Sequence, residues 1–156
     1  MDTTGNEQKT VDQLVIFRAR MLLFAAFSFA LWQFGWVVMD IKPIKSSIIY
    51  QVAGWSSVIG AVCWAIASLL FVKFSKQMKQ SSACSALQDE LTIKNRNIAF
   101  VKSFFVTIGL VWALVPLMDL WAFDVKQAVR IIAVIGITLP MVLFSISELK
   151  NDEGAE

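Results

Sequence analysis

The sequence predicts an all-α membrane protein, an antiparallel bundle of four transmembrane helices with a cytosolic helical extension before the third span. Of its 156 residues, 57% are hydrophobic, whereas soluble domains average about 45–50%, and the excess falls into four blocks. Residues 46–72 form a run without one charged side chain, and a helix needs about 20 apolar residues to cross a bilayer. We expect one domain over residues 1–156, with spans at roughly 15–39, 46–72, 98–118 and 127–147.

The first span is preceded by a capping-box pattern, in which Thr10 is the expected N-cap and Gln13 reaches back to it. Arg18 and Arg20 stand at the interface before the apolar core. That core continues to Val38, well beyond the 7–15 apolar residues of a signal peptide. No cleavage is therefore expected, and the helix should end near Pro43, which disfavours helix at the residue before it.

The second span is the charge-free run itself, and a polar connection, residues 73–97, follows it. Another capping-box pattern, Ser85 to Gln88, predicts a cytosolic helix that starts near Ser85 and continues into the third span. The uncharged core of that span, residues 103–118, is short. The apolar length can extend back to about Ile98, because Lys102 can turn its ammonium group toward the interface.

The fourth span is predicted to begin after Asp124, a plausible N-cap, and Pro140 inside it predicts a kink. An acidic tail, residues 148–156, ends the chain. With four spans, both termini and the middle connection share one side. Ten of the 14 basic residues lie on that side, and because cytoplasmic loops are rich in Lys and Arg, both termini are expected in the cytoplasm of a bacterial-type inner membrane.

Small residues recur at every fourth position of the second span, namely Ala53, Ser57, Ala61 and Ala65. Small side chains let two helix backbones approach closely, and packing must hold membrane helices together because lipid supplies no hydrophobic drive. The pattern predicts a packing face. Either a second copy of the chain or another helix of the same bundle could occupy it.

Asp40 and Asp119 each follow a methionine at the outer end of an odd-numbered span. Arg130 is expected at the depth of Asp119, across a short turn, and Lys42 and Lys45 are close to Asp40 in the sequence. An acid at a helix C-terminus opposes the helix dipole, so each one needs a nearby cation. The outer polar cluster Asp40, Asp119 and Arg130 is either a vestibule for a cation or polar ligand, or a pair of boundary signals with interfacial ion pairs.

A second group of charges, Lys73, Lys76 and Lys79, follows the second span directly. Basic residues beside a span attract anionic lipid, and they also set the topology. Of the two cysteines, Cys63 lies within the span and Cys84 in the connection, so we expect two free thiols.

The composition argues against most enzymatic chemistry. The chain contains no histidine, which removes bis-histidine haem ligation, His-ligated zinc and His-based triads. The span cores carry no ionisable side chain, whereas ion-coupled transporters usually hold one near the midplane. We expect no catalytic residue, no cofactor and no metal, and a net charge of +2 gives no reason to expect nucleic-acid binding.

The sequence therefore favours a small non-enzymatic inner-membrane protein that acts through helix–helix contacts. It would be an accessory subunit, or an immunity or exclusion factor, whose partners are the lipid bilayer and a membrane protein or a second copy. The alternative is an oligomeric channel or small transporter with the outer cluster at its mouth. Its polar lining would come from hydroxyl side chains, at Ser56, Ser57, Thr107 and Thr138.

Overall fold

The computed structural model describes residues 3–41, 48–80, 90–121 and 124–153, and these residues form four long helices. They are α1 (Thr3–Met39), α2 (Ile48–Gln80), α3 (Glu90–Trp121) and α4 (Val125–Glu153). Each contains a segment long and apolar enough to cross a membrane: Val11–Met39, Ile48–Met78, Glu90–Met118 and Val125–Lys150. The predicted all-helical fold, with four helices long and apolar enough to span a membrane, is therefore confirmed for the described residues.

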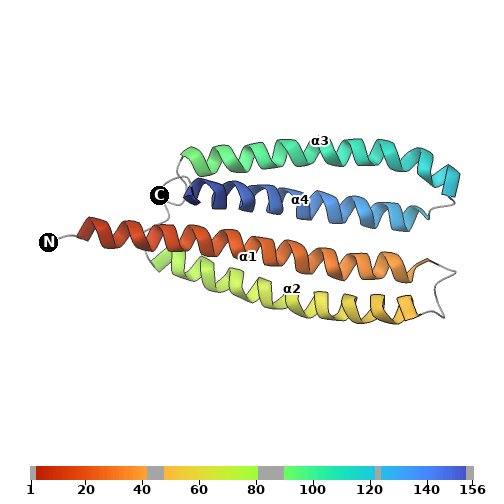
Figure 1. Cartoon of the computed structure of the whole chain (residues 1–156), viewed down its shortest axis with the longest axis horizontal. Coiled ribbons are helices and arrows are strands. Elements are labelled where there is room, and N and C mark those ends of the chain that lie inside the picture. The colour runs from red at the N-terminus through yellow and green to blue at the C-terminus, as the bar shows by residue number, and fades with distance from the viewer. Residues whose placement is uncertain (1–2, 42–47, 81–89, 122–123, 154–156) are drawn as a thin grey trace.

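The helices are longer than the bilayer is thick. At 1.5 Å per residue the 37 residues of α1 extend about 55 Å, against a hydrocarbon core of about 30 Å. At the end of the molecule that carries both chain termini, which we call the terminal end, α1 projects beyond the other three helices (Figure 1). The opposite end, where α1 leads to α2 and α3 leads to α4, is called the connector end. The predicted helix start near Ser85 lies outside the described residues.

The four helices lie in one row, in the order α2, α1, α4, α3 (Figure 1). Extensive contacts join α1 to α2, α1 to α4 and α3 to α4 among the described residues. The helices thus do not close into a square bundle around a shared core. α1 and α4 each have two neighbours, whereas α2 and α3 form the edges of the row and have one neighbour each.

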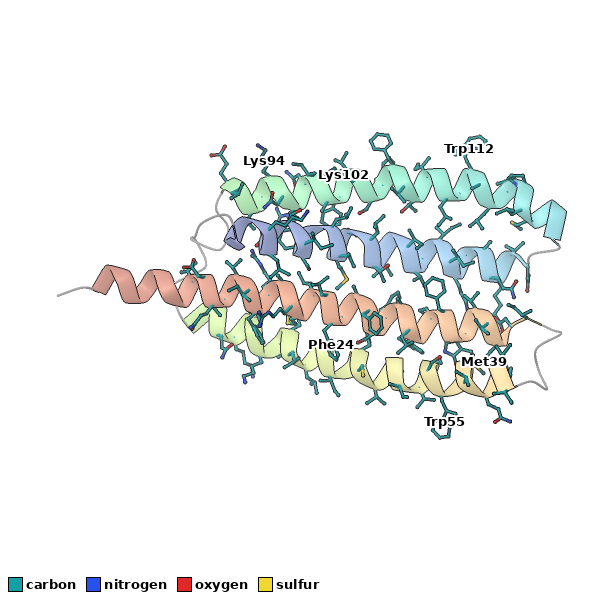
Figure 2. All side chains as sticks on the ribbon, viewed as in Figure 1. Phe24, Met39, Trp55, Lys94, Lys102 and Trp112 are labelled. Atoms are coloured by element: carbon teal, nitrogen blue, oxygen red, sulfur yellow. The ribbon has the colours of Figure 1, made fainter. Side chains whose placement is uncertain are left out.

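The interior of this row is narrow and built from small residues. Its buried apolar positions include alanines on all four helices, at Ala19, Ala26, Ala53, Ala67, Ala99 and Ala128. Many large side chains point outward. Trp55 and Trp112 are 70% and 74% exposed (Figure 2), and Phe105 is 67% exposed. Bulky side chains outside and small ones inside suit a protein surrounded by lipid, because lipid covers the apolar surface and close packing holds the helices together.

Two prolines lie inside helices, Pro116 in α3 and Pro140 in α4. Proline lacks the N–H that would bond the carbonyl four residues earlier. Pro140 is buried and helix α4 continues through it to Glu153. The predicted acidic tail therefore begins inside α4, and its first residue, Glu148, belongs to the packed part of the molecule.

Candidate functional site

The seam between α1 and α4 carries an ion pair at the terminal end. Arg18 Nη2 donates to Glu148 Oε2, and the two side chains are 13% and 3% exposed. The guanidinium of Arg18 also lies 5.3 Å from the centroid of the Phe144 ring, a favourable cation–π distance. A buried carboxylate depends on its cation for compensation, because breaking such a pair leaves an unpaired buried charge. Glu148 is therefore held by α1 and is not a solvated tail residue.

A second ion pair closes the same seam at the connector end. Arg130 Nη1 donates to Asp40 Oδ2, and the ammonium of Lys126 lies 3.5 Å from the same oxygen. Arg130 also lies 5.7 Å from the centroid of the Trp36 ring. Asp40, one residue past the end of α1, thus has the cation that its unfavourable place at a helix C-terminus requires.

The two ion pairs bracket the apolar part of the seam. Along α4, Arg130 and Glu148 are 18 residues apart, a rise of about 27 Å, close to the hydrocarbon thickness of about 30 Å. The two pairs are therefore separated by about the thickness of the hydrocarbon core that a membrane-spanning helix must cross. Together they fix the register of α1 against α4 at both ends.

The predicted outer polar cluster is brought together in part. Asp40 and Arg130 are in direct contact, and Lys126, which was not part of the predicted cluster, adds a second cation. Asp119 lies in α3, but its side chain is outside the described part of the chain. In this arrangement the Asp40 carboxylate is already paired by protein cations, so its oxygens serve to join helices.

A very close helix contact lies between α1 and α2 and is formed by two glycines, one from each helix. A Cβ atom added at Gly35 would lie 2.7 Å from the backbone oxygen of Ala53, and one at Gly60 would lie 2.5 Å from the backbone nitrogen of Trp32. Both distances are too short for carbon, so only glycine permits this approach. Between the two glycines, the Ser57 hydroxyl donates to the Trp32 carbonyl at 3.0 Å.

The predicted packing face on α2 follows this contact only at its start. Ala53 and Ser57 are buried, Ala61 is half-buried and Ala65 is exposed. With about 100° of rotation per residue, a strict spacing of four residues turns about 40° per step around the helix. After three steps the ladder has left the α1 side, and the buried line continues instead through Gly60 and Ala67.

Aromatic rings extend the α1–α2 contact toward the terminal end. Trp64 of α2 lies against both Phe29 and Trp32 of α1, with ring centroids 6.2 and 5.8 Å apart. Further along, the ring centroids of Phe17 and Phe74 are 6.1 Å apart. These contacts place Phe74 at the membrane depth of Phe17.

An open apolar groove of about 410 Å³ lies at the connector end of the same pair of helices. Gly54, whose missing side chain leaves space beside Met39, forms part of its wall. Trp36 is shared between this groove and the Arg130 guanidinium. The other lining residues are Tyr50, Gln51, Trp55, Ser57 and Val58.

The hydroxyls expected to line a channel each donate to a backbone carbonyl. Ser56 donates to Ala53 O at 2.9 Å, Thr107 to Ser103 O at 2.8 Å and Thr138 to Val134 O at 2.7 Å. Ser57 donates to α1, as described above. Moreover, α2 and α3 lie at opposite edges of the row, so their hydroxyls do not face a common space within one chain.

The remaining candidate residues lie at the surface or outside the described part of the chain. Lys73 and Lys76 are exposed on α2, whereas the side chain of Lys79 and all of Cys84 are outside the described regions. Cys63 is a half-buried free thiol. Among the described residues, no three His, Cys, Asp or Glu side chains gather where a metal ion could be held.

The geometry thus presents two α1–α4 ion pairs and a close α1–α2 glycine contact, arranged to hold helices together. Arg18, Glu148 and Gly35 were missed as contact residues by the sequence interpretation. The only signal for the glycines was their small size within apolar runs. Comparison with protein-family models, with curated proteins and with solved structures gives no match for this chain.

Proposed function

We propose that this chain is a small non-enzymatic protein of a bacterial-type inner membrane that acts through helix–helix contacts with a membrane partner, as an accessory subunit or an immunity or exclusion factor. In this proposal the helices cross the bilayer in antiparallel order, with both termini and the extension of α3 in the cytoplasm.

The observation that carries the proposal is the open row. Its edge helix α3 contacts only α4 extensively and leaves a surface suited to another helix. Gly109 and Ala113, one helical turn apart, are exposed on that surface, and a Cβ at Gly109 would meet no atom within 4 Å. Small residues four positions apart allow a neighbouring helix to approach closely.

The placement of charges also favours a contact role over chemistry. The two described ion pairs on the α1–α4 seam lie at the ends of its apolar part, and their charges neutralise one another. An ion-coupled transporter would be expected to keep ionisable groups near the midplane. The hydroxyls of the alternative channel are bonded to helix backbone and give that alternative no support.

The decisive experiment is affinity purification from native membranes in a mild detergent, followed by identification of the bound proteins. We expect a stoichiometric membrane partner, or a second copy, that is lost with Gly109→Leu and retained with Ile108→Leu, a neighbouring exposed position. A chain that purifies alone as a monomer, or a partner indifferent to both substitutions, would refute the proposal.

The orientation is tested separately by labelling Cys84 in a Cys63→Ala variant with a membrane-impermeant maleimide. We expect labelling of inverted membrane vesicles and none of intact cells. Labelling from outside intact cells would reverse the proposed topology without bearing on the partner experiment.

A further inference from the structure

Exposed basic side chains gather at the terminal end on all four helices. Their depths can be compared through three contacts between neighbouring helices. Arg18 pairs with Glu148, the Phe17 ring lies against the Phe74 ring, and Gly136 lies beside Thr107. These contacts relate the depth of each helix to that of its neighbour.

The level of the Arg18–Glu148 pair can then be followed onto α3. Glu148 is 12 residues, or about 18 Å, beyond Gly136 along α4. The same rise from Thr107 toward the start of α3 reaches Asn95. Asn95 therefore lies at about the depth of Glu148, and one plane at the membrane boundary passes near Arg18, Phe74, Asn95 and Glu148.

Six exposed cations lie within about 5 Å of this plane at 1.5 Å per residue. We call them the terminal belt. Every helix contributes at least one of them: Arg20 from α1, Lys73 and Lys76 from α2, Lys94 and Arg96 from α3, and Lys150 from α4.

The acids at this end do not cancel the belt among the side chains that the structure describes. Glu148 is buried and paired with Arg18. Asp12 and Glu90 are exposed. Asp12 precedes Arg18 by six residues on α1, and Glu90 precedes Asn95 by five residues on α3. They therefore lie about 9 and 7.5 Å farther from the membrane, which separates an inner cationic level from a more acidic outer one.

Lys102 adds a deeper cation on the edge helix (Figure 2). It is exposed and lies seven residues, about 10 Å, inside the level of Asn95. A lysine at this depth extends its ammonium group toward the interface. Along α3, Lys94 is therefore placed to reach a lipid phosphate from the water side, and Lys102 is placed to reach it from the bilayer side.

We propose that the terminal belt is a binding surface for anionic phospholipid headgroups and that Lys102 extends it into the bilayer along α3. The exposed cations lie at the membrane boundary, where lipid phosphates are found, and each is worth about 1 kcal/mol near an anionic surface. This inference is independent of the proposed protein partner.

The test measures lipid selectivity of the full-length chain in phosphatidylcholine vesicles. Trace spin-labelled phosphatidylglycerol and phosphatidylcholine are compared by the fraction that the protein immobilises. We expect about a fivefold preference for phosphatidylglycerol, which corresponds to about 1 kcal/mol, and a marked loss of it in 0.5 M NaCl, where charges are screened. Equal immobilisation of the two lipids, or a preference that is insensitive to salt, would overturn the proposal.

A matched pair of variants assigns the preference to the belt. Replacing Lys73, Lys76, Lys94 and Lys102 together by Gln should markedly weaken the preference, because it removes three of the six belt cations and Lys102, whereas replacing the same four by Arg should retain it. All four side chains are exposed, and circular dichroism checks that both variants keep their helices. Preference retained in the Gln variant would contradict the proposal. So would full competition by millimolar inorganic phosphate, because the surface would then bind phosphate anions without selecting lipid.

Discussion

Gly60→Ala should separate α1 from α2. The added Cβ would lie 2.5 Å from Trp32 N and 2.9 Å from Trp32 Cα, and these atoms cannot rotate away as a flexible side chain could. Restoring an ordinary contact of about 3.4 Å requires the helices to move apart locally by about 0.9 Å. The Ser57–Trp32 hydrogen bond, 3.0 Å long, would then approach 4 Å and be lost.

The cost follows from these two changes. Overpacking a tight interface costs about 1–3 kcal/mol, and a lost interhelical hydrogen bond in a membrane protein adds about 0.6 kcal/mol. The higher helix propensity of alanine relative to glycine offsets about 0.5–1 kcal/mol of this loss. The net expectation is a loss of about 1–3 kcal/mol in the free energy of unfolding.

The assay is reversible unfolding of the purified chain in mixed micelles at increasing mole fraction of sodium dodecyl sulfate, followed by circular dichroism. Gly136→Ala is the control, because its Cβ would meet Thr107 at an ordinary 3.9 Å. We expect this control to be neutral or slightly stabilising. If Gly60→Ala is tolerated as well as Gly136→Ala, the close α1–α2 approach is wrong.

Three further predictions use the same unfolding assay. Glu148→Ala should lower the free energy of unfolding by about 3–5 kcal/mol, because it leaves Arg18 as a partly buried charge without its carboxylate. Adding Arg18→Leu to this variant should recover part of the loss. A double variant whose loss equals the sum of the two single losses would argue against the ion pair. Asp40→Asn should lower the free energy of unfolding by about 1–3 kcal/mol, since a charged hydrogen bond at the connector end is lost. An unchanged midpoint of the unfolding transition would show that this ion pair does not hold α1 to α4. Ser57→Ala should lower the free energy of unfolding by about 0.6 kcal/mol, because it removes an interhelical hydrogen bond. Ser68→Ala should be neutral, because the Ser68 hydroxyl bonds within its own helix. Equal effects of the two substitutions would contradict the interhelical bond.

The spans were predictable because each needs only a local property, a long apolar run. The charge-free residues 46–72 define a membrane helix whatever surrounds them. The order of helices in the row has no such local signal. Hydropathy does not distinguish α1 beside α4 from α1 beside α3, so the open row could not be derived from composition.

The ion pairs show the same limit at the level of single residues. Arg18 and Glu148 are 130 residues apart in the chain, and each has an adequate local explanation, as a topology signal and as the start of an acidic tail. Only the placement of α4 against α1 joins them. For Asp40, its place at a helix C-terminus predicted a nearby cation, but the cations expected there were Lys42 and Lys45, and Arg130 was expected beside Asp119.

The sequence predicted that small residues of α2 form a packing face, but it did not predict which side of the helix faces α1. Ala53 and Ser57 were singled out because small residues permit close helix contacts. The contact follows steps of four, three and seven residues, through Ala53, Ser57, Gly60 and Ala67. The strict four-residue ladder to Ala65 winds away from it. Which of several small residues meets a neighbour depends on helix rotation, and several rotations satisfy the same hydropathy.

The order of helices in the row has a consequence for biosynthesis. Chains emerge from the ribosome N-terminus first, so α1 and α2 can form their glycine contact as soon as both have entered the membrane. α3 is made next, but its extensive contacts are with α4, which has not yet been synthesised. The last helix then joins the α1–α2 pair to α3. A chain that stops before Val125 would therefore contain the α1–α2 contact and an α3 that lacks its principal neighbour.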